Sequence, residues 1–284
     1  MLIFTKIKLR HVFAKKLIKQ YWKIIYVLFY KMVLNKENKK NISGGNMQRY
    51  FVSKKNDKFI LTDLDLHHIK DVMRIKSNGE IICVYDNKSY LCTITYNNSS
   101  YDIKIINECD NDVELSKDVI LYQAVIKNEK FDLVVQKACE LGVKEIVPTI
   151  FERSVVKVDN KNIENKLNRY NKIIKEACEQ SHRQVLANIR PFINLKDIKE
   201  DDDTLKIMAY ENNNDKHSLK NVLSKIDNYK KIAIVIGPEG GFTIDEVNYL
   251  LSIGFISVSL GKRILRSETA SIALLAIIAS YLEG

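Results

Sequence analysis

The chain has 284 residues, of which 46% are hydrophobic and 28% charged, as in a soluble globular protein with one large or two ordinary domains. Its formal net charge of +10 arises in residues 1–46, which hold 11 Lys and Arg and one acid, so that 34 basic and 34 acidic residues balance over the rest. This distribution excludes a uniformly basic nucleic-acid binder, and any RNA affinity must come from local patches.

The five cysteines are widely spaced and odd in number. They form no Cys-x-x-Cys pair, which argues against both a disulfide framework and a zinc site. A reducing cytoplasm is the expected compartment, and no metal site is predicted. The cysteines are Cys83, Cys92, Cys109, Cys139 and Cys178.

Residues 1–46 are predicted to lie outside the working protein. Their longest apolar run is residues 24–30, whereas a membrane span needs about 20 such residues. A basic interfacial helix and, less favoured, a secretory signal are alternatives. The favoured hypothesis is that translation begins at Met47, because the codons of Gly44 and Gly45 can form a purine-rich ribosome-binding site ahead of it.

Residues 47–115 read as a small β-rich module, predicted to be a barrel. A strand is expected at 47–52, an apolar stretch follows at 58–61, and a helix begins near Thr62 and ends near 77–79. Three further strands are then separated by turns rich in Asn, Asp and Ser. They span 80–86, 89–96 and 101–106.

The helix of this module carries two adjacent histidines, His67 and His68. Neighbouring helical residues point about 100° apart, so a shared metal is disfavoured and one inward and one outward side chain are expected. Arg49 and Arg74 are candidate RNA contacts, with solvated surface charges as the plainer interpretation.

Residues 116–284 alternate strands and helices, which indicates a mostly parallel α/β sheet. A nearly continuous apolar strand at 118–126 is typical of burial on both faces. The other expected strands are 146–150, 205–210, 232–236 and 255–260. The expected helices are 130–142, 167–181, a short one within 211–230, 244–254 and 268–282. Thr243 and Glu246 have capping-box spacing, and Ser267 is predicted to cap the last helix.

Two unusual loops leave the ends of apolar strands, at residues 237–242 and 261–270. Ligands of open α/β sheets bind beyond the carboxyl ends of the strands, so both loops are expected to form one pocket. The first has neither the Walker pattern nor the dinucleotide Gly-x-Gly-x-x-Gly pattern. The glycines of the first loop are equally compatible with a tight turn and with a backbone that lines a ligand. The second loop has apolar side chains and free backbone groups, which suit an adenine-like ring.

At this point the sequence resembles a known family. The segments that carry the likeness are 47–52, 68–74, 136–143, 176–181, 236–241 and 260–270, in order over residues 47–284. They are similar to the RsmE family, small-subunit ribosomal RNA uridine-N3 methyltransferases of the SPOUT class. Lys262 departs from the family, which often has Pro there.

The resemblance implies a PUA-like β-barrel domain at 47–115 that holds RNA, then a SPOUT α/β domain at 116–284 with a trefoil knot. It implies S-adenosylmethionine as cofactor, 16S ribosomal RNA or the small-subunit particle as substrate, a cytoplasmic homodimer and no membrane attachment. Carried over to this chain, the cofactor-binding residues are Gly237, Gly240, Gly241, Leu260, Gly261, Ile264, Leu265 and Thr269.

The chemistry needs no metal, because the sulfonium methyl donor is already electrophilic. Arg266 is expected to stabilise negative charge on the uracil and Glu268 to orient the base or accept its proton. Arg49 is the third catalytic candidate, and the RNA-binding candidates are Arg49, Arg74, Arg183 and Arg263. The alternatives are a SPOUT enzyme for another RNA, a non-catalytic assembly factor, and a protein attached to membranes through residues 1–46.

Overall fold

A computed structural model describes residues 47–97, 100–109, 113–156, 162–210 and 218–283. Residues Gln48–Gly284 cluster as one compact unit. The expectations about residues 1–46, including the start at Met47, lie outside the described residues. Within the part of the chain that is described, every helix is too short or too polar to cross a lipid bilayer.

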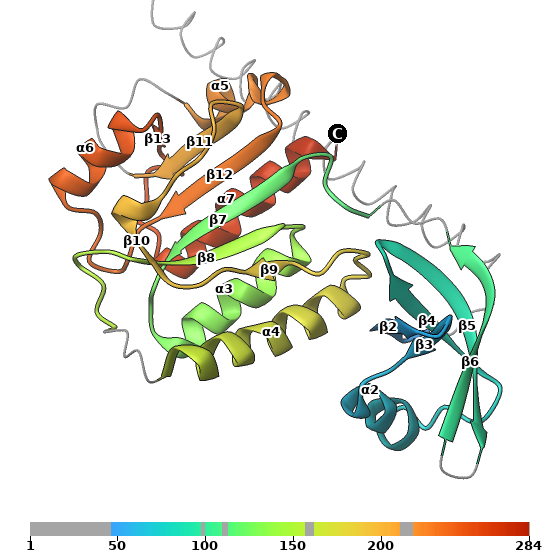
Figure 1. Cartoon of the computed structure of the whole chain (residues 1–284). Coiled ribbons are helices and arrows are strands. Elements are labelled where there is room, and N and C mark those ends of the chain that lie inside the picture. The colour runs from blue at the N-terminus through green and yellow to red at the C-terminus, as the bar shows by residue number, and fades with distance from the viewer. Residues whose placement is uncertain (1–46, 98–99, 110–112, 157–161, 211–217, 284) are drawn as a thin grey trace, which may run out of the picture. The chain divides into compact units, whose positions relative to one another are not determined.

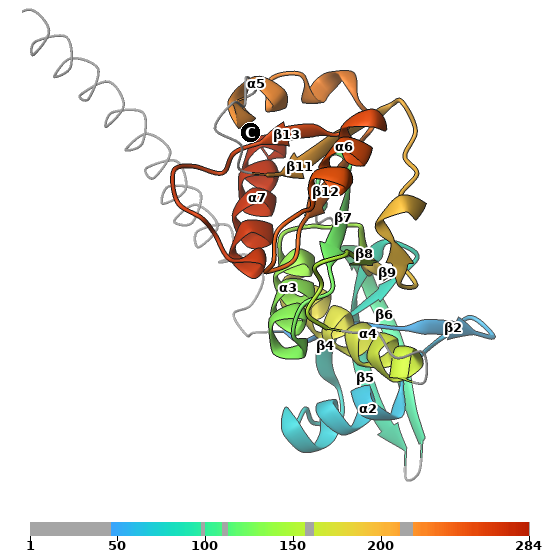
Figure 2. The same cartoon turned by 90° about the vertical axis from the view of Figure 1, so that its left-hand side faces the viewer.

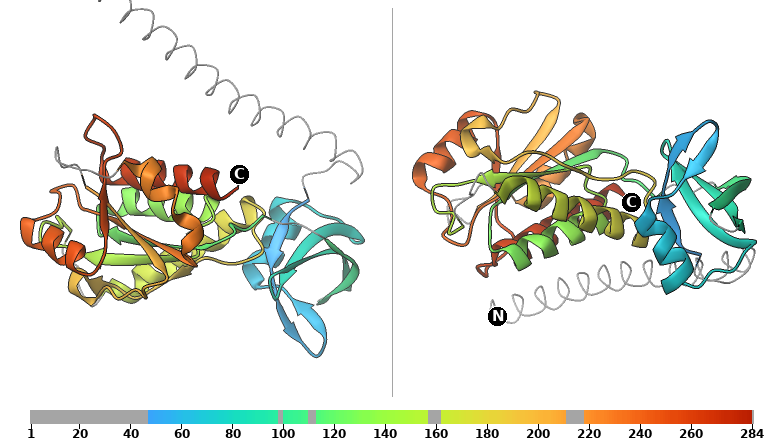
Figure 3. Two further views of the ribbon diagram at one scale, coloured as in Figure 1. Left: turned by 90° about the horizontal axis from the view of Figure 1, so that it is seen from above. Right: turned by 60° about the horizontal axis from the view of Figure 1, so that its bottom comes forward.

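The N-terminal module is built on a four-stranded sheet in the order β1-β4-β5-β6. Its strands are β1 (Arg49–Phe51), β4 (Gly79–Tyr85), β5 (Lys88–Asn97) and β6 (Ser100–Cys109). A separate antiparallel hairpin of β2 (Ser53–Lys55) and β3 (Lys58–Ile60) projects beside it (Figure 3). The three predicted turn-linked strands are confirmed, but a closed barrel is not, since no described pairing joins β6 to β1.

The helix of this module changes its winding part-way. Thr62 caps α2 (Asp63–His67) through a capping box with Asp65, and a π-helical turn, η2 (His68–Val72), follows directly. The expected division of the two histidines is confirmed. His67 is exposed and its Nδ1 lies 2.5 Å from Asp71 Oδ2, whereas the half-buried His68 Nδ1 lies 2.9 Å from the Tyr50 hydroxyl.

The C-terminal part forms the parallel sheet that the alternating pattern predicted (Figure 1). Its strand order is β10-β8-β7-β12-β11-β13, with β9 pairing beside β8. In chain order the strands are β7 (Asp118–Ala124), β8 (Glu145–Ile150), β9 (Asn188–Ile189), β10 (Ile193–Asn194), β11 (Thr204–Ala209), β12 (Lys231–Ile236) and β13 (Ile256–Val258).

Helices cover both faces of this sheet (Figure 2). They are α3 (Asn128–Glu140), α4 (Ile163–Gln180), α5 (Leu219–Leu223), α6 (Ile244–Ser252) and α7 (Ser267–Leu282). In β12, Ile232 and Ile234 pack into the core formed with α3, α4, α5 and α7, while Ala233 and Val235 pack into the core formed with α6. Both faces are therefore buried, which explains the uninterrupted apolar strands in the sequence.

Some local predictions differ from the structure. The short strands β9 and β10 were not predicted, and they lie on either side of Pro191, which has no N–H to donate to a ladder. The capping box of Thr243 and Glu246 is confirmed at the start of α6. The predicted cap of α7 is wrong: Arg266 occupies the N-cap without a side-chain bond, and Ser267 is the first helical residue.

Candidate active site

A cavity of about 260 Å³ lies where β11, β12 and β13 end, between the loop after β12 and the loop between β13 and α7. Figure 2 shows the second of these loops as a long connection into α7. The cavity is lined by Ala209, Tyr210, Ile236, Gly237, Pro238, Gly241, Phe242, Val258, Ser259, Leu260, Gly261, Arg263, Ile264, Leu265, Ser267 and Ala270. The two unusual loops thus contribute to one pocket, as the sequence predicted.

Most of the predicted cofactor residues contribute to this lining. They are Gly237, Gly241, Leu260, Gly261, Ile264 and Leu265. Gly240 and Thr269 do not line the cavity. Thr269 is exposed, and Gly240 packs against Arg153, whose Nη1 donates to the Gly240 carbonyl at 3.3 Å.

Two lining glycines have backbone angles that other residues rarely adopt. Gly261 has φ +123° and Gly241 has φ +69°, and a Cβ atom at either would meet no other heavy atom within 4 Å. Their requirement for glycine therefore comes from the backbone and not from crowding. The N–H of Gly241 donates to the Pro238 carbonyl at 2.9 Å, and the N–H of Gly261 donates to Ser259 Oγ at 3.2 Å, so each loop is held in part by its own backbone.

The chemistry of the lining suits a ligand with a flat apolar ring and polar edges. Apolar side chains predominate, and Phe242 is fixed by edge-to-face contacts with Phe151 and Tyr210 at centroid distances of 5.5 and 5.8 Å. The volume lies near the lower end of the roughly 300–1,000 Å³ found for small-molecule clefts. The polar side chains of the lining are Tyr210, Ser259, Arg263 and Ser267.

The two loops are joined by a buried hydrogen bond. The Ser267 hydroxyl donates to the Gly237 carbonyl at 2.6 Å, and it accepts a 3.0 Å bond from Nε2 of Gln123 on β7. This pairing explains why Ser267 does not cap α7, since its hydroxyl is engaged by the loop and the strand.

A charged cluster connects the same two loops from the other side. Lys130 Nζ, on α3, lies 3.4 Å from Glu239 Oε1 in the first loop and 3.5 Å from Glu268 Oε1 in the first turn of α7. The Glu268 side chain is 12% exposed, and its Oε2 is buried without a hydrogen-bond partner. A buried carboxylate oxygen with no donor is costly, which singles out Glu268 on the flank of the site, although Glu268 does not line the cavity itself.

Comparisons with known proteins agree with this geometry. Residues 113–279 match the RNA methyltransferase domain family and residues 61–106 the RNA methyltransferase PUA domain. The chain is 39% identical to Ribosomal RNA small subunit methyltransferase E of Mesomycoplasma hyopneumoniae, over 81% of this chain and 97% of the relative. The chain belongs to the ribosomal RNA small subunit methyltransferase E family. The corresponding Bacillus subtilis protein is 32% identical, with 84% and 98% covered.

A solved member of the family has the same fold. It is Ribosomal RNA small subunit methyltransferase E from Neisseria gonorrhoeae, bound to S-adenosyl methionine. It superposes with a TM-score of 0.73 at 29% identity, covering 83% of this chain and 98% of the solved chain. The structural likeness therefore extends over both the sheet of the N-terminal module and the parallel sheet.

The predicted arginines of this family member occupy different environments. Arg263 and Arg266 are exposed in the second loop, and of the two only Arg263 lines the cavity. Arg74 is exposed after η2, with φ +53°. These three remain available for contact with RNA.

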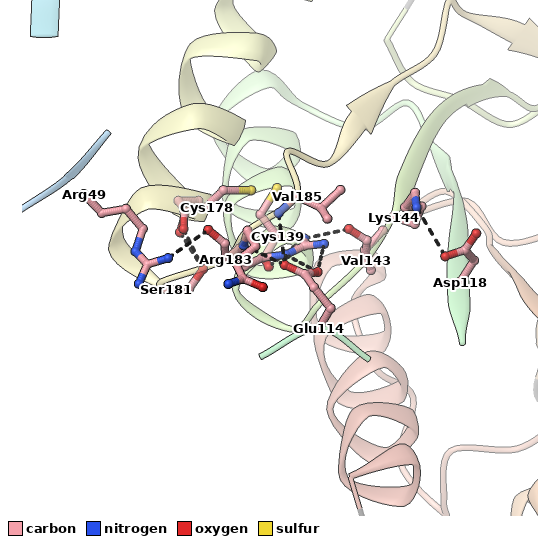
Figure 4. A network of polar contacts seen from close by, with 12 residues as sticks. Arg49, Glu114, Asp118, Cys139, Val143, Lys144, Cys178, Ser181, Arg183 and Val185 are labelled. Atoms are coloured by element: carbon pink, nitrogen blue, oxygen red, sulfur yellow. Dashed lines mark hydrogen bonds and ion pairs between the residues drawn. The ribbon is translucent and has the colours of Figure 1, made fainter. Parts of the chain in front are cut away.

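Arg49 and Arg183, by contrast, are buried, and both belong to the polar network drawn in Figure 4. Arg49 is 7% exposed, and its Nη1 donates to Ser89 Oγ at 2.7 Å and to the Arg183 carbonyl at 3.5 Å. Arg183 is 2% exposed and pairs with Glu114. The surface placement expected for Arg49 is therefore wrong, because its side chain is buried. Neither arginine lines the cavity, and the buried contacts of both argue against binding of phosphate.

Sequence reasoning missed several residues of the site. Gln123 and Lys130 lie far along the chain from both loops, and Ala209 and Tyr210 end a strand that carries no distinctive motif. Gln123 did offer one signal, as a lone amide within an apolar strand. A buried amide must find hydrogen-bond partners, so its presence there pointed to a polar contact beneath the pocket.

Proposed function

We propose that this protein transfers the methyl group of S-adenosylmethionine to N3 of a uridine in 16S ribosomal RNA of the small subunit. The observation that carries the proposal is that both loops line the same cavity, in a chain that belongs to this family. The solved relative bound to S-adenosyl methionine supports the choice of cofactor.

The residues present fit that cofactor. The bound cofactor supplies a methyl group on a positively charged sulfur, a strong electrophile. Leu260 and Leu265 offer apolar surface to the adenine ring, and Gly241 and Gly261, which have no side chain, allow a ligand to approach the backbone closely. Ile264, 90% exposed at the rim, is positioned to cover a ligand in the cavity.

Methylation at N3 also requires loss of the N3 proton from uracil. Glu268 is proposed to accept it, because Oε2 lacks a hydrogen-bond partner while Oε1 faces Lys130. Negative charge then develops on the uracil carbonyl oxygens, and Arg266, exposed at the N-cap of α7, is proposed to stabilise it. The enzyme otherwise acts by holding the methyl group and N3 in line.

Contact with RNA is proposed at Arg74 and Arg263, whose guanidinium groups are exposed. Arg49 and Arg183 are assigned instead to the buried network of Figure 4. A catalytic role for Arg49 has no geometric support, because its side chain is buried away from the cavity lining.

The finer organisation expected from the family is proposed as well. It comprises an N-terminal extension at 1–46, a PUA-like barrel at 47–115 and a SPOUT domain with a trefoil knot at 116–284. We also propose a cytoplasmic homodimer packed through α7, because Ile277 and Tyr281 on this apolar helix are 44% and 45% exposed. Light scattering of the purified protein would give its oligomeric state.

The function is tested with the full-length protein and small-subunit particles from cells that lack the gene. Titration of S-adenosylmethionine should show binding, and labelled methyl should appear on N3 of one uridine of 16S RNA. Binding with transfer only to another RNA would support the alternative substrate class. Binding of RNA without binding of the cofactor would indicate an assembly factor instead.

A further inference from the structure

A short chain of buried polar side chains lies directly beneath the cavity. Gln123 and Ser271 are fully buried and Ser267 is 6% exposed. They come from β7 and from the first turns of α7, and only Ser267 lines the cavity. Polar side chains in such a position are costly unless every group is hydrogen-bonded, so their bonding pattern is informative.

The environment of Gln123 determines the orientation of its amide. Nε2 lies 3.0 Å from Ser267 Oγ and 3.1 Å from the Ala124 carbonyl, and Oε1 accepts from the Ser271 hydroxyl. In the reversed orientation, Oε1 would face the Ala124 carbonyl, which is also an acceptor. The Ala124 carbonyl therefore requires Nε2 on this side, and Nε2 then donates to Ser267.

This orientation determines where the Ser267 proton goes. A hydroxyl has one proton to donate, and Ser267 Oγ already accepts from Gln123. Its proton therefore goes to the Gly237 carbonyl, 2.6 Å away. The short distance and the low exposure of Ser267 indicate a strong contact between α7 and the first loop.

Gly237 is held from a second direction as well. A Cβ atom at this position would lie 2.8 Å from the Phe242 ring, so the ring packs directly on the Gly237 backbone. Gly237, Phe242 and Ser267 all line the cavity. The ring holds Gly237 against the end of its own loop, and the hydrogen bond from Ser267 holds it against the start of α7.

We infer that Gln123 and Ser267 are positioning residues that preorganise this pocket for S-adenosylmethionine, with Gln123 acting through the hydroxyl of Ser267. The inference rests on the proposed function, since it takes the cofactor from there. Without the Ser267 hydroxyl, the Gly237 carbonyl is left buried without this donor, and the loops must be ordered at the time of binding. Cofactor affinity then falls, because part of the binding free energy is spent on ordering the two loops.

The experiment measures S-adenosylmethionine binding by calorimetry for the full-length protein and five variants. Ser267→Ala should weaken binding about 10-fold or more, the range for loss of a buried hydrogen bond. Gln123→Met should weaken it less, about 3-fold, because Ser267 can still donate to Gly237 while losing its directing partner. Ser267→Thr, which keeps the hydroxyl, should restore most of the affinity.

Ser252→Ala provides the matched control, because the Ser252 hydroxyl on α6 also donates to a backbone carbonyl, that of Tyr249 at 2.7 Å, outside the cavity. It should bind like the wild type. Thermal unfolding monitors stability, with Ile81→Val in the N-terminal sheet as a destabilised reference.

The outcomes separate the two proposals. If the wild type binds the cofactor and folded Ser267→Ala binds equally well, or if Ser267→Thr fails to restore affinity, the positioning role is wrong. If Ile81→Val weakens binding as much as Ser267→Ala does, a purely structural effect accounts for the loss. A folded wild type that binds no S-adenosylmethionine would overturn the proposed function, and this inference with it.

Discussion

The guanidinium of Arg183 lies against the carboxylate of Glu114, with Nη2 2.7 Å from Oε2, and so joins the end of α4 to the segment before β7 (Figure 4). The same guanidinium donates from Nη1 to the carbonyls of Cys139 and Val143 at 3.2 and 2.8 Å. Glu114 Oε1 also accepts from two backbone N–H groups, those of Gln184 and Val185. This pair therefore organises three chain segments at once.

Glu114→Gln should lower the free energy of unfolding by about 3 kcal/mol, because it leaves the charge of the buried Arg183 without its carboxylate partner. Urea unfolding would measure this loss. Asp118→Asn is the matched control: the Asp118–Lys144 pair is 3.4 Å apart with both side chains about half exposed, and its loss should cost less than about 1 kcal/mol. Equal losses in the two variants would contradict a structural role for the Arg183–Glu114 pair.

A second prediction concerns pH. Burial raises the pKa of Glu179 to about 7, although nearby Lys175 and the N–H of Phe51, which donates to Oε1 at 3.1 Å, act in the opposite direction. The folded state therefore holds the carboxyl proton of Glu179 more tightly than the unfolded state does. The stability that protonated Glu179 contributes is present in full below the usual carboxyl pKa and is lost as pH rises through about 7.

Glu179→Gln should remove this dependence, because the amide mimics the protonated acid and can still accept from Phe51. We expect unfolding free energy of the wild type to fall by at most about 3 kcal/mol between pH 4.5 and 8, and the variant to lose most of that slope. Urea titrations across this range would measure both. Parallel curves for the two proteins would show that another group is responsible.

The sequence predicted what local chemistry determines. The apolar strand 232–236 and the capping box of Thr243 and Glu246 depend on neighbouring residues, and both are confirmed. The interpretations of Ser267 and Arg49 failed because their partners are distant in sequence: Gly237 is 30 residues from Ser267, and Arg183 is 134 from Arg49. The hydrogen-bond partner of a residue in cap position, or of a lone arginine, depends on the tertiary fold and cannot be predicted from neighbouring residues.

The positive φ of Gly261 gives a third prediction. Replacement by Ala at φ +123° should cost roughly 1–3 kcal/mol of strain, because L-residues rarely adopt this angle. The loop would relax to avoid that cost, and S-adenosylmethionine binding should weaken about 10-fold or more. Gly254→Ala is the control, with φ +91° at the turn after α6 and outside the cavity. Gly254→Ala should lower the melting temperature yet leave cofactor affinity unchanged. Weakened binding in both variants would mean that general destabilisation, and not the conformation of the second loop, controls cofactor affinity.

The last prediction separates chemistry from binding at the start of α7. Arg266→Ala should reduce methyl transfer about 100-fold if its guanidinium stabilises negative charge on the uracil, while S-adenosylmethionine binding stays within about 2-fold, because Arg266 does not line the cavity. Glu268→Gln should also slow transfer about 100-fold or more, since an amide cannot accept the N3 proton. Single-turnover transfer to undermethylated small-subunit particles, alongside calorimetric titration of the cofactor, measures both quantities.

Lys262→Ala is the matched control for these variants, because Lys262 is an exposed cation of the same loop that does not line the cavity. It should leave cofactor binding unchanged and alter transfer by no more than about 3-fold, through weaker electrostatic attraction of RNA. If Arg266→Ala behaves like Lys262→Ala, general attraction of RNA accounts for the effect of Arg266. If Glu268→Gln turns over at the wild-type rate, the buried Oε2 of Glu268 is not the proton acceptor, and the proton leaves through solvent or through another group at the site.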